Sequence, residues 1–280
     1  MSPLDREQVV SHLKQLPSLP SVVSELLASF GNDDIDVGRI AQQIAHDQGL
    51  TARVLRVANS SFYGLQSRVG TINEAVVVLG FRAVRSMVLA VGMSGALRLD
   101  QCQGFDGQAY LRHCVAVGLA ARAIAPFAGH NPELAFTAGI LHDIGELVLA
   151  SSFPEQYAAV LAYRAQHDCF MVVAERDILG LDHAEVGGLL ADTWHFPSSL
   201  RDAVALHHQP ASAPAGSLAD LIHVADGIAH ALGMALAQDE MVMPVERTAW
   251  LRLGLDSEKL GRILPQVESD MDATYQAIKG

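Results

Sequence analysis

Histidines and aspartates form the most distinctive pattern in this sequence. At two places a histidine is directly followed by another potential metal ligand. These pairs are His142-Asp143 and His207-His208. Imidazole and carboxylate groups are the ligands that borderline divalent metals prefer. The sequence therefore offers a candidate metal site, with ligands drawn from His113, His142, Asp143, His183, His207, His208 and Asp226.

The adjacent pairs matter because neighbouring residues on an α-helix point about 100° apart. One pair can contact two metal ions, or one ion and a substrate. A carboxylate that bridges two ions can hold them around a water molecule that attacks a phosphoester. In this interpretation Asp143 is the candidate catalytic residue.

A purely structural interpretation also applies to these side chains. A single histidine on an apolar helix is usually a core residue with satisfied hydrogen bonds. We assign that interpretation, or a surface position, to His12, His46, His130, His167, His195 and His230. His223 lies one helical turn before Asp226, so it is either a neighbour of the site or a hydrogen-bonding partner.

Helix signals dominate the elements that must position these residues. Asn131 precedes a proline that suits the first turn of a helix, and glycines occur where helices would end. The run from Val76 to Leu79 resembles a short strand, but a capping box before it favours a helix. The boxes are Thr71 with Glu74, Ser152 with Glu155 and Asp182 with Glu185, and the terminating glycines are Gly80, Gly180 and Gly233. The prediction is an all-α fold.

Composition excludes several classes of protein. The 280 residues are 50% hydrophobic and 18% charged, so the chain can bury a core and is not disordered. A net charge of −12 makes a nucleic-acid binder or a protein that docks on anionic membranes improbable. Three cysteines without a CxxC pair indicate a reducing compartment. Because no signal pattern or long apolar run is evident, we expect a cytoplasmic protein without a membrane segment.

The helical pattern is interrupted once, by DQCQGFDGQ at residues 100–108. We therefore expect an N-terminal helical part at 1–105 and a histidine-rich part at 106–280. In the first part, Phe62 and Tyr63 are either anchors for a partner protein or packed aromatics, and we favour packing. The final stretch, 256–280, is predicted to be helical with Pro265 kinking or splitting it, and a dimer contact is one use for it.

Several long motifs, in order, resemble the HDOD family, a branch of the HD phosphohydrolase superfamily in bacterial signalling. The motifs are LPSLPSVVSELL (16–27), IAQQIAHDQGLTARVLRVANSSFYG (40–64), INEAVVVLGFRAVRSMVLA (72–90), HCVAVGLAARAIA (113–125), AFTAGILHDIGELVL (135–149) and DHAEVGGLLADTWHFPSSLRDAVALHH (182–208). The resemblance extends from about Leu16 to about Leu232. It implies an N-terminal helical bundle packed on a C-terminal HD-like bundle.

The resemblance also implies roles for the candidate ligands. His113, His142-Asp143 and Asp226 match the minimal HD metal set, and His183 with His207-His208 matches the extra ligands of binuclear HD-GYP relatives. In many HDOD proteins these positions are degraded and the domain resembles a non-catalytic signalling module. The complete set here favours metal binding, with one or two ions of Fe, Mn, Zn or Ni.

Two departures argue against a cyclic dinucleotide phosphodiesterase. No GYP tripeptide follows His208, and Glu146 stands where those enzymes usually have a lysine. A glutamate there would repel a substrate phosphate, at a cost of about 1 kcal/mol or more depending on burial.

Three functional hypotheses follow from the sequence. The first is a signalling output module with a protein partner and a metal-binding pocket, in which oligomerisation remains open. The second is a metal-dependent phosphohydrolase acting on a nucleotide or cyclic dinucleotide. The third is a structural bundle whose histidines are core residues.

Overall fold

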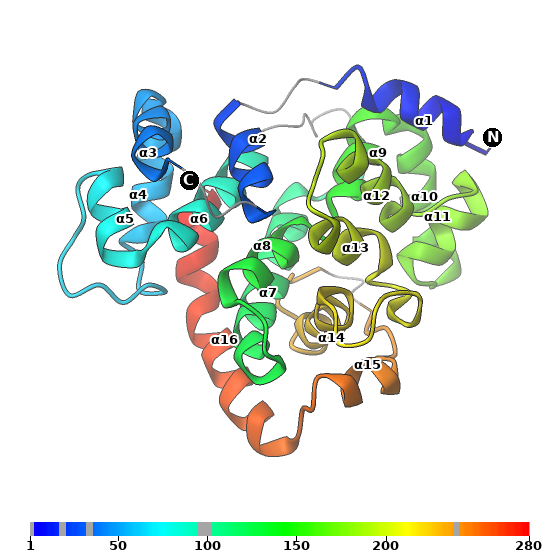
Figure 1. Ribbon diagram of the computed structural model, residues 1–280. Helices are drawn as coiled ribbons and strands as arrows, with labels where there is room; N and C mark the ends of the chain where they lie inside the picture. Colours follow the sequence, from blue (N-terminus) through cyan, green and yellow to red (C-terminus); the bar gives the residue numbers. More distant parts are fainter. Residues whose placement is uncertain (1–2, 17–20, 32–35, 95–101, 238–240, 280) are drawn as a thin grey trace.

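The computed structural model describes residues 3–16, 21–31, 36–94, 102–237 and 241–279. Within these ranges every regular element is a helix, so the all-α prediction is confirmed. Figure 1 shows one group of helices from α2 to α6 beside a larger group that begins at α7, with α16 running along α7 between them.

The N-terminal group is built from short amphipathic helices. Its members are α2 (Ser21–Ala28), α3 (Val37–His46), α4 (Gln48–Ala58), α5 (Ile72–Leu79) and α6 (Phe81–Ser94). The apolar run at Val76 belongs to α5, so the helix prediction for it is confirmed. The Thr71 hydroxyl accepts from the Glu74 N–H at 3.1 Å and Glu74 accepts from the Thr71 N–H at 3.2 Å, which is the predicted capping box.

The C-terminal group supplies all the elements that carry the candidate ligands. It contains α7 (Gly107–Ile124), α8 (Pro132–Leu141), α9 (Ile144–Ser152), α10 (Pro154–His167), α11 (Met171–Leu179), α12 (His183–Thr193), α13 (Ser198–Leu206), α14 (Leu218–Ala231) and α15 (Arg247–Arg252). As predicted, Asn131 caps α8 by accepting from the Glu133 and Leu134 N–H groups, and Asp182 caps α12 by accepting from the Glu185 N–H.

One predicted cap is wrong. Ser152 is the last residue of α9, and α10 begins at Pro154 with Phe153 in the N-cap position and no side-chain cap. Pro154 has no N–H to satisfy and fits the first turn of a helix, so α10 can begin without a serine cap. The three predicted helix-ending glycines all have positive φ: Gly80 and Gly180 directly follow their helices, and Gly233 comes after Leu232, the C-cap of α14.

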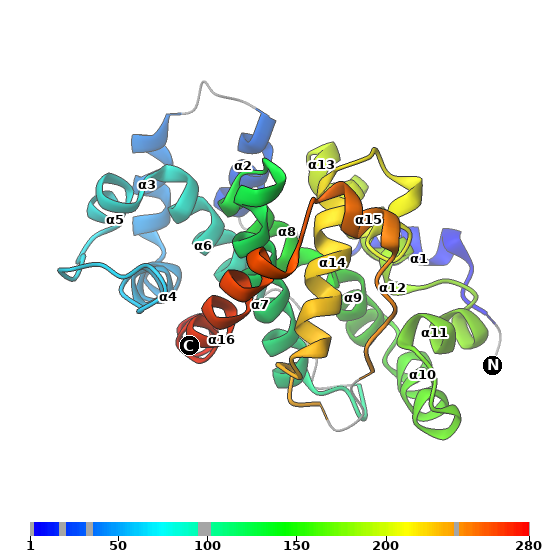
Figure 2. The ribbon, with the colours of Figure 1, turned by 90° about the horizontal axis from the view of Figure 1, so that it is seen from below.

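Both ends of the described chain pack on the C-terminal group. Figure 2 shows α1 (Arg6–Leu13) beside α12, where Arg6 approaches Glu185 and the Leu4 N–H donates to the Leu179 carbonyl at 2.8 Å. The last helix, α16 (Ser257–Lys279), continues through Pro265, so the proline does not split it. Buried side chains on both sides, Ile263 and Val267, hold the two halves of α16 in one helix.

The expected boundary near residue 105 falls in the loop before α7. Part of that loop, residues 95–101, lies outside the described residues. Cys102, the first described residue after that stretch, is buried, and its thiol lies 3.5 Å from the Pro154 carbonyl oxygen.

Two stretches, Gly107–Ala128 and Pro132–Ser152, are long and apolar enough to cross a membrane by length and composition alone. In each, most of the apolar window is buried inside the protein. They form the centre of the helical bundle, so packing accounts for their apolar character.

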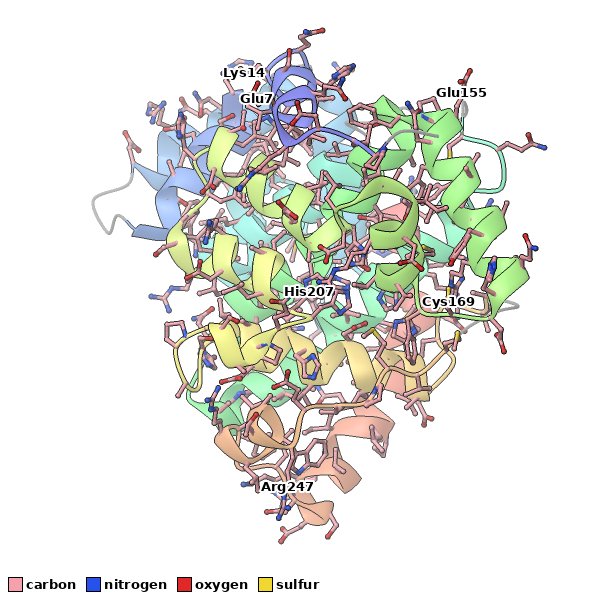
Figure 3. The ribbon with its side chains drawn as sticks, turned by 90° about the vertical axis from the view of Figure 1, so that its right-hand side faces the viewer. Glu7, Lys14, Glu155, Cys169, His207 and Arg247 are labelled. Carbon is pink, nitrogen blue, oxygen red and sulfur yellow. The ribbon has the colours of Figure 1, made fainter. Side chains whose placement is uncertain are left out.

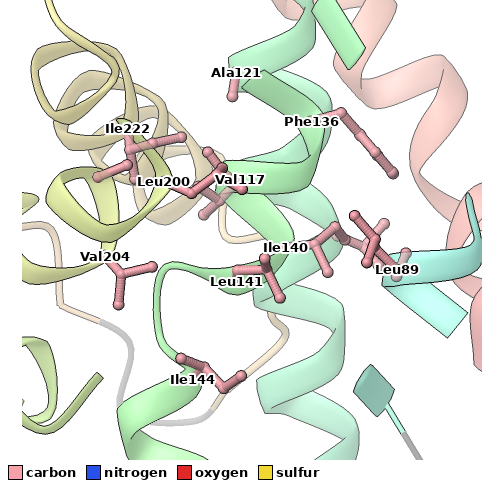
Figure 4. Packing of buried hydrophobic residues seen from close by; sticks show 14 of the residues in the cluster. Leu89, Val117, Ala121, Phe136, Ile140, Leu141, Ile144, Leu200, Val204 and Ile222 are labelled. Carbon is pink, nitrogen blue, oxygen red and sulfur yellow. The ribbon is translucent and has the colours of Figure 1, made fainter. Parts of the chain in front are cut away.

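Helices α7 and α8 form the centre because two glycines let their backbones touch. A Cβ on Gly139 would lie 2.6 Å from the Gly118 Cα. Figure 4 shows Val117 and Leu141 from these helices between Leu200 on one side and Leu89 on the other. The close crossing brings the middle of α7 near the end of α8, where two candidate ligands lie.

A second close contact joins α9 to α12. A Cβ on Gly145 would lie 1.9 Å from the His183 carbonyl oxygen and 2.7 Å from the Gly187 nitrogen. Only a glycine allows this approach, because both neighbours are backbone atoms that cannot move aside. The contact fixes the Asp143 end of α9 against the His183 end of α12.

Polar contacts join the N-terminal group to α7 and α8. Arg122 of α7 forms an ion pair with Glu133 of α8 at 2.9 Å. Two aromatic residues between α4 and α5 contact this pair. The Phe62 ring lies 4.1 Å from the Arg122 guanidinium, and the Tyr63 hydroxyl lies 3.4 Å from Glu133. Phe62 also packs 5.7 Å from Phe136. Phe62 and Tyr63 are half-buried, as the packing interpretation predicted.

We expect Gly145→Ala to destabilise the protein by about 1–3 kcal/mol or more, because its methyl group must push α9 and α12 apart. Urea unfolding of the metal-free protein measures the change. Gly261→Ala is the matched control, because Gly261 lies in α16 with no other group within 4 Å of its Cβ position. That control should gain about 0.5–1 kcal/mol. Unchanged stability of Gly145→Ala would contradict the tight contact.

Candidate metal centre

The seven candidate ligands gather in one cluster inside the C-terminal group. His113 lies in the middle of α7 and Asp226 in α14, while His183 is the first residue of α12. The two adjacent pairs occupy helix ends: His142 and Asp143 join α8 to α9, and His207 and His208 follow α13. Figure 3 shows His207 in the middle of the molecule. His142 and His207 are wholly buried, so they do not serve as surface residues.

Both histidine-led pairs share one hydrogen-bond arrangement. The His142 Nδ1 lies 2.8 Å from the Gly139 carbonyl oxygen, and the His207 Nδ1 lies 2.8 Å from the Val204 carbonyl oxygen. A carbonyl oxygen can only accept, so each Nδ1 must carry the proton. These carbonyls lie in the last turns of α8 and α13, where intrahelical partners are lacking. The helix ends therefore orient both rings with Nε2 toward the cluster.

Asp143 lies at the centre, and its two carboxylate oxygens face different sides. Oδ2 lies 3.0 Å from the His142 Nε2 and 3.5 Å from the His113 Nε2. Oδ1 lies 3.3 Å from the Nε2 atoms of both His183 and His207. One carboxylate thus separates two groups of imidazole nitrogens.

Each side of Asp143 is completed by one further residue. On the Oδ2 side, Asp226 Oδ1 lies 3.2 Å from the His113 Nε2 and 4.0 Å from the His142 Nε2. On the Oδ1 side, the His208 Nε2 lies 2.9 Å from the His183 Nε2. Ligand atoms of Asp143, His183, His207 and His208 all lie within 4.8 Å of one another, as do those of His113, His142 and Asp143.

Several atoms in the cluster face each other without hydrogen bonds. Among the described residues, Asp143 Oδ1, Asp226 Oδ1 and His207 Nε2 are buried and have no hydrogen-bond partner. With Nδ1 protonated, a neutral imidazole presents a lone pair from Nε2 toward a carboxylate oxygen. Lone pairs in such contact repel unless a cation lies between them. The cluster is therefore capable of metal binding, and its donor set fits divalent ions.

Carboxylates control the protonation of two of the histidines. Burial disfavours charge on His113, but Asp143 and Asp226 outweigh burial and raise the pKa of His113 to about 10. Burial is likewise outweighed at His183, where Glu175 and Asp143 hold the pKa well above its usual value. In the metal-free protein these two imidazoles carry protons at neutral pH.

His142, His208 and Asp143 have pKa values below their ordinary ranges. Burial lowers the pKa of His142 and holds the pKa of His208 well below its usual value. Burial alone would raise the pKa of Asp143, but the neighbouring histidines hold it well below its ordinary range. The centre therefore presents an ionised Asp143 beside unprotonated His142 and His208, whereas His113 and His183 must each lose a proton before they can bind metal.

A second layer of residues holds the ligands in place. Glu175 is fully buried on α11, and its Oε2 accepts from the His183 Nδ1 at 2.7 Å and from the His183 backbone N–H at 2.9 Å. The Tyr157 hydroxyl donates to the other oxygen of Glu175 at 3.2 Å. Such a carboxylate behind a histidine fixes the ring and increases its basicity as a ligand.

His223 belongs to this second layer as well. Its Nδ1 donates to the His207 carbonyl at 2.7 Å, and its Nε2 accepts from the Glu246 N–H at 2.8 Å. Both ring nitrogens are thereby used. Of the two interpretations given to His223, the structure supports the hydrogen-bonding partner.

A cavity of about 660 Å³ opens beside the cluster. Glu146 lines it together with Asp143, and its carboxylate lies within reach of Glu175 and His183. Burial, and then the charge of Asp143, raise the pKa of Glu146 to about 8. In the metal-free protein Glu146 is therefore mostly neutral at pH 7, which weakens the repulsion of phosphate expected from the sequence.

The sequence alone missed two residues of this region. His230 was assigned to the core or the surface, yet its Nε2 lies 3.2 Å from Asp226 Oδ1 and it lines the cavity. Its spacing of four residues from Asp226 on a helix was the available signal. Glu175 lies between Val172 and Leu179 on the buried face of α11, and its charge within that apolar spacing was the signal there.

Comparison with known proteins identifies the family. A family model described as the HDOD domain matches residues 16–210. A protein of Treponema pallidum (strain Nichols) named "Uncharacterized protein" is 28% identical over 210 residues. That match covers 74% of this chain and 40% of the relative, so the chain spans less than half of the relative's length.

Three crystal structures are similar along nearly the whole chain. A "Putative phosphohydrolase" from Shewanella amazonensis SB2B is 32% identical with a TM-score of 0.76, and the match covers 97% of each chain. An HDOD domain protein of unknown function from Geobacter sulfurreducens is 23% identical with a TM-score of 0.80, covering 98% of each. A "Putative signal transduction protein" from Marinobacter aquaeolei VT8 is 22% identical with a TM-score of 0.77, covering all of this chain and 62% of that one.

The last two similarities concern the fold alone. The family model, in contrast, spans well over half of the chain and includes six of the seven candidate ligands. The protein therefore belongs to the HDOD family.

Proposed function

We propose that this protein is a signalling module whose C-terminal bundle binds two divalent metal ions, one on each side of Asp143. One ion would be held by His113, His142 and Asp226, and the other by His183, His207 and His208, with Asp143 between the two groups. The observation that carries the proposal is that each oxygen of Asp143 faces its own set of imidazole nitrogens.

The donor set supports borderline divalent ions. Imidazole and carboxylate together suit Fe, Mn, Zn or Ni, whereas calcium and magnesium prefer oxygen ligands. When bound, a pair of such ions supplies Lewis acidity and lowers the pKa of water. The chain's own part is to fix the His142 and His207 rings through backbone carbonyls and to hold His183 against Glu175.

Two further points support a role in signalling with a protein partner. One structural relative is named a "Putative signal transduction protein", and its chain is longer than the part that this protein matches. The other is that Glu146, an acid, lines the cavity where the related phosphodiesterases usually carry a lysine. Glu146, mostly neutral at pH 7, supplies none of the positive charge with which a lysine there would meet a substrate phosphate.

A metal-dependent phosphohydrolase is the second candidate. The cavity beside the cluster favours it, because a substrate there would reach Asp143, His183 and His208 directly. The relative from Shewanella amazonensis SB2B, at 32% identity, is named "Putative phosphohydrolase". In this candidate Asp143 would bind metal and orient the attacking water.

We expect the purified protein to contain two divalent ions per chain, measured by elemental analysis after growth with added Mn or Fe. Asp143→Asn should reduce affinity at both positions by about 10- to 100-fold or more, because it removes the shared charge. His167→Gln is the control, since His167 is exposed and its Nδ1 bonds only to the nearby Tyr163 carbonyl. Full metal content in Asp143→Asn would contradict the proposal.

Metal binding should release protons and strengthen as pH rises. His113, with a pKa of about 10, and His183 are both protonated at pH 7 in the metal-free protein, so metal must displace about two protons. Calorimetric titration in buffers of different ionisation enthalpy counts them. Glu175→Gln should lower the count, because it removes the carboxylate that holds the proton on His183. Binding without proton release would contradict these assignments.

The two candidates differ in turnover. As a signalling module, the Mn-loaded protein should leave a panel of nucleotides and cyclic dinucleotides unhydrolysed in assays of phosphate and nucleotide release. Rapid turnover that Asp143→Asn abolishes would instead establish the phosphohydrolase and exclude a purely binding role.

A further inference from the structure

The cavity beside the metal centre changes from polar to apolar along its length. We propose that it takes a small molecule with a single anionic head, held at the metal centre, and an aliphatic body held between the apolar walls. The chemical class is an alkyl phosphate or phosphonate. This inference rests on the proposed metal centre, because the ions are what would hold the head.

The polar end of the cavity is the ligand cluster itself. Six cluster side chains reach the cavity surface: His113, Asp143, His183, His208, Asp226 and His230. With two divalent ions bound among these groups, the charge at this end becomes attractive to an anion. An anionic head would therefore bind at this end.

Most of the remaining wall residues come from four separate segments and are apolar. One face of α10 contributes residues at helical spacing, and the start of α11, the loop before α7 and the segment after α14 close the sides. These wall residues include Phe105, Ala158, Leu161, Ala162, Ala165, Phe170, Met171, Met241 and Met243.

The larger wall residues are only half-buried, unlike the core of the bundle. Phe105, Leu161, Phe170 and Met243 each keep part of their surface open to the cavity. Apolar side chains that converge on a concave surface of this size are typical of sites for small organic ligands. Methionines at such a surface adapt to flexible chains, because their side chains are unbranched and polarizable.

The charges of the walls favour one anionic group rather than several. Beyond the cluster, Arg164 is the cation among the described lining residues, and Asp106 and Glu146 contribute acids. A ligand with two phosphates spread along the cavity would place one of them beside apolar or acidic walls. Binding of phosphate there needs paired cationic donors. A dinucleotide therefore fits poorly, whereas an aliphatic body fits well.

Calorimetric titration of the Mn-loaded protein with methyl-, butyl- and octylphosphonate tests the proposal. Phosphonates are suitable because their P–C bond is not cleaved by phosphoester hydrolysis. Each buried methylene should strengthen binding about threefold to fourfold, so octylphosphonate should bind about 100-fold more tightly than butylphosphonate. A cyclic dinucleotide should bind more weakly than octylphosphonate.

Two wall variants and one control make the test specific. Met243→Gln and Leu161→Gln should remove most of the preference for octylphosphonate and leave methylphosphonate binding unchanged, because they make the walls polar without adding charge. Val173→Gln is the control, because Val173 is exposed on α11 and does not line the cavity. It should bind every phosphonate as the unaltered protein does.

Different failures have different meanings. If Mn binds but affinity does not depend on chain length, or if the wall variants behave as the control does, this inference is wrong and the metal proposal stands. Tighter binding of the dinucleotide would also overturn it. If the protein binds no Mn, the proposed function fails, and the anchoring of an anionic head fails with it.

Discussion

The candidate site depends on two hydrogen bonds that each join an imidazole to the end of its own helix. The Gly139 and Val204 carbonyls accept hydrogen bonds from the Nδ1–H groups of His142 and His207. These bonds orient both rings so that the Nε2 lone pairs point toward Asp143. The His207 Nε2 and the Asp143 Oδ1 that it faces are both buried and have no hydrogen-bond partner among the described residues. An arrangement of buried acceptors is costly unless a cation lies among them, and this cost is the physical reason to expect metal.

Close helix contacts convert this local arrangement into a cluster. The Gly118–Gly139 crossing brings α7 and α8 together, and Gly145 places α9 directly against the start of α12. The candidate ligands therefore lie within helices or directly at helix ends. The second layer, with Glu175 behind His183, limits the rotation of the rings. The same helices leave a cavity on one side of the cluster, where apolar walls begin.

The sequence was informative about the helices and about the ligands that occur in pairs. Capping residues at Thr71 and Asn131 marked helix starts, because a cap is a local interaction. The capping box predicted at Ser152 was wrong because the serine-to-glutamate spacing also occurs where one helix ends and the next begins. Here α9 ends at Ser152 and α10 begins at Pro154. Glu175 and His230 were missed because their roles depend on α11 and α14 meeting distant helices. Spacing along the chain does not encode which apolar residues surround the cavity.

The most direct measurement is anomalous diffraction from crystals of the Mn-loaded protein at the manganese edge. The account predicts two peaks, one between Asp143 and the His113–His142 pair and the other between Asp143 and the His183–His207 pair. No peak within reach of either oxygen of Asp143, or a single peak that leaves His183 and His207 without an ion, would contradict the account.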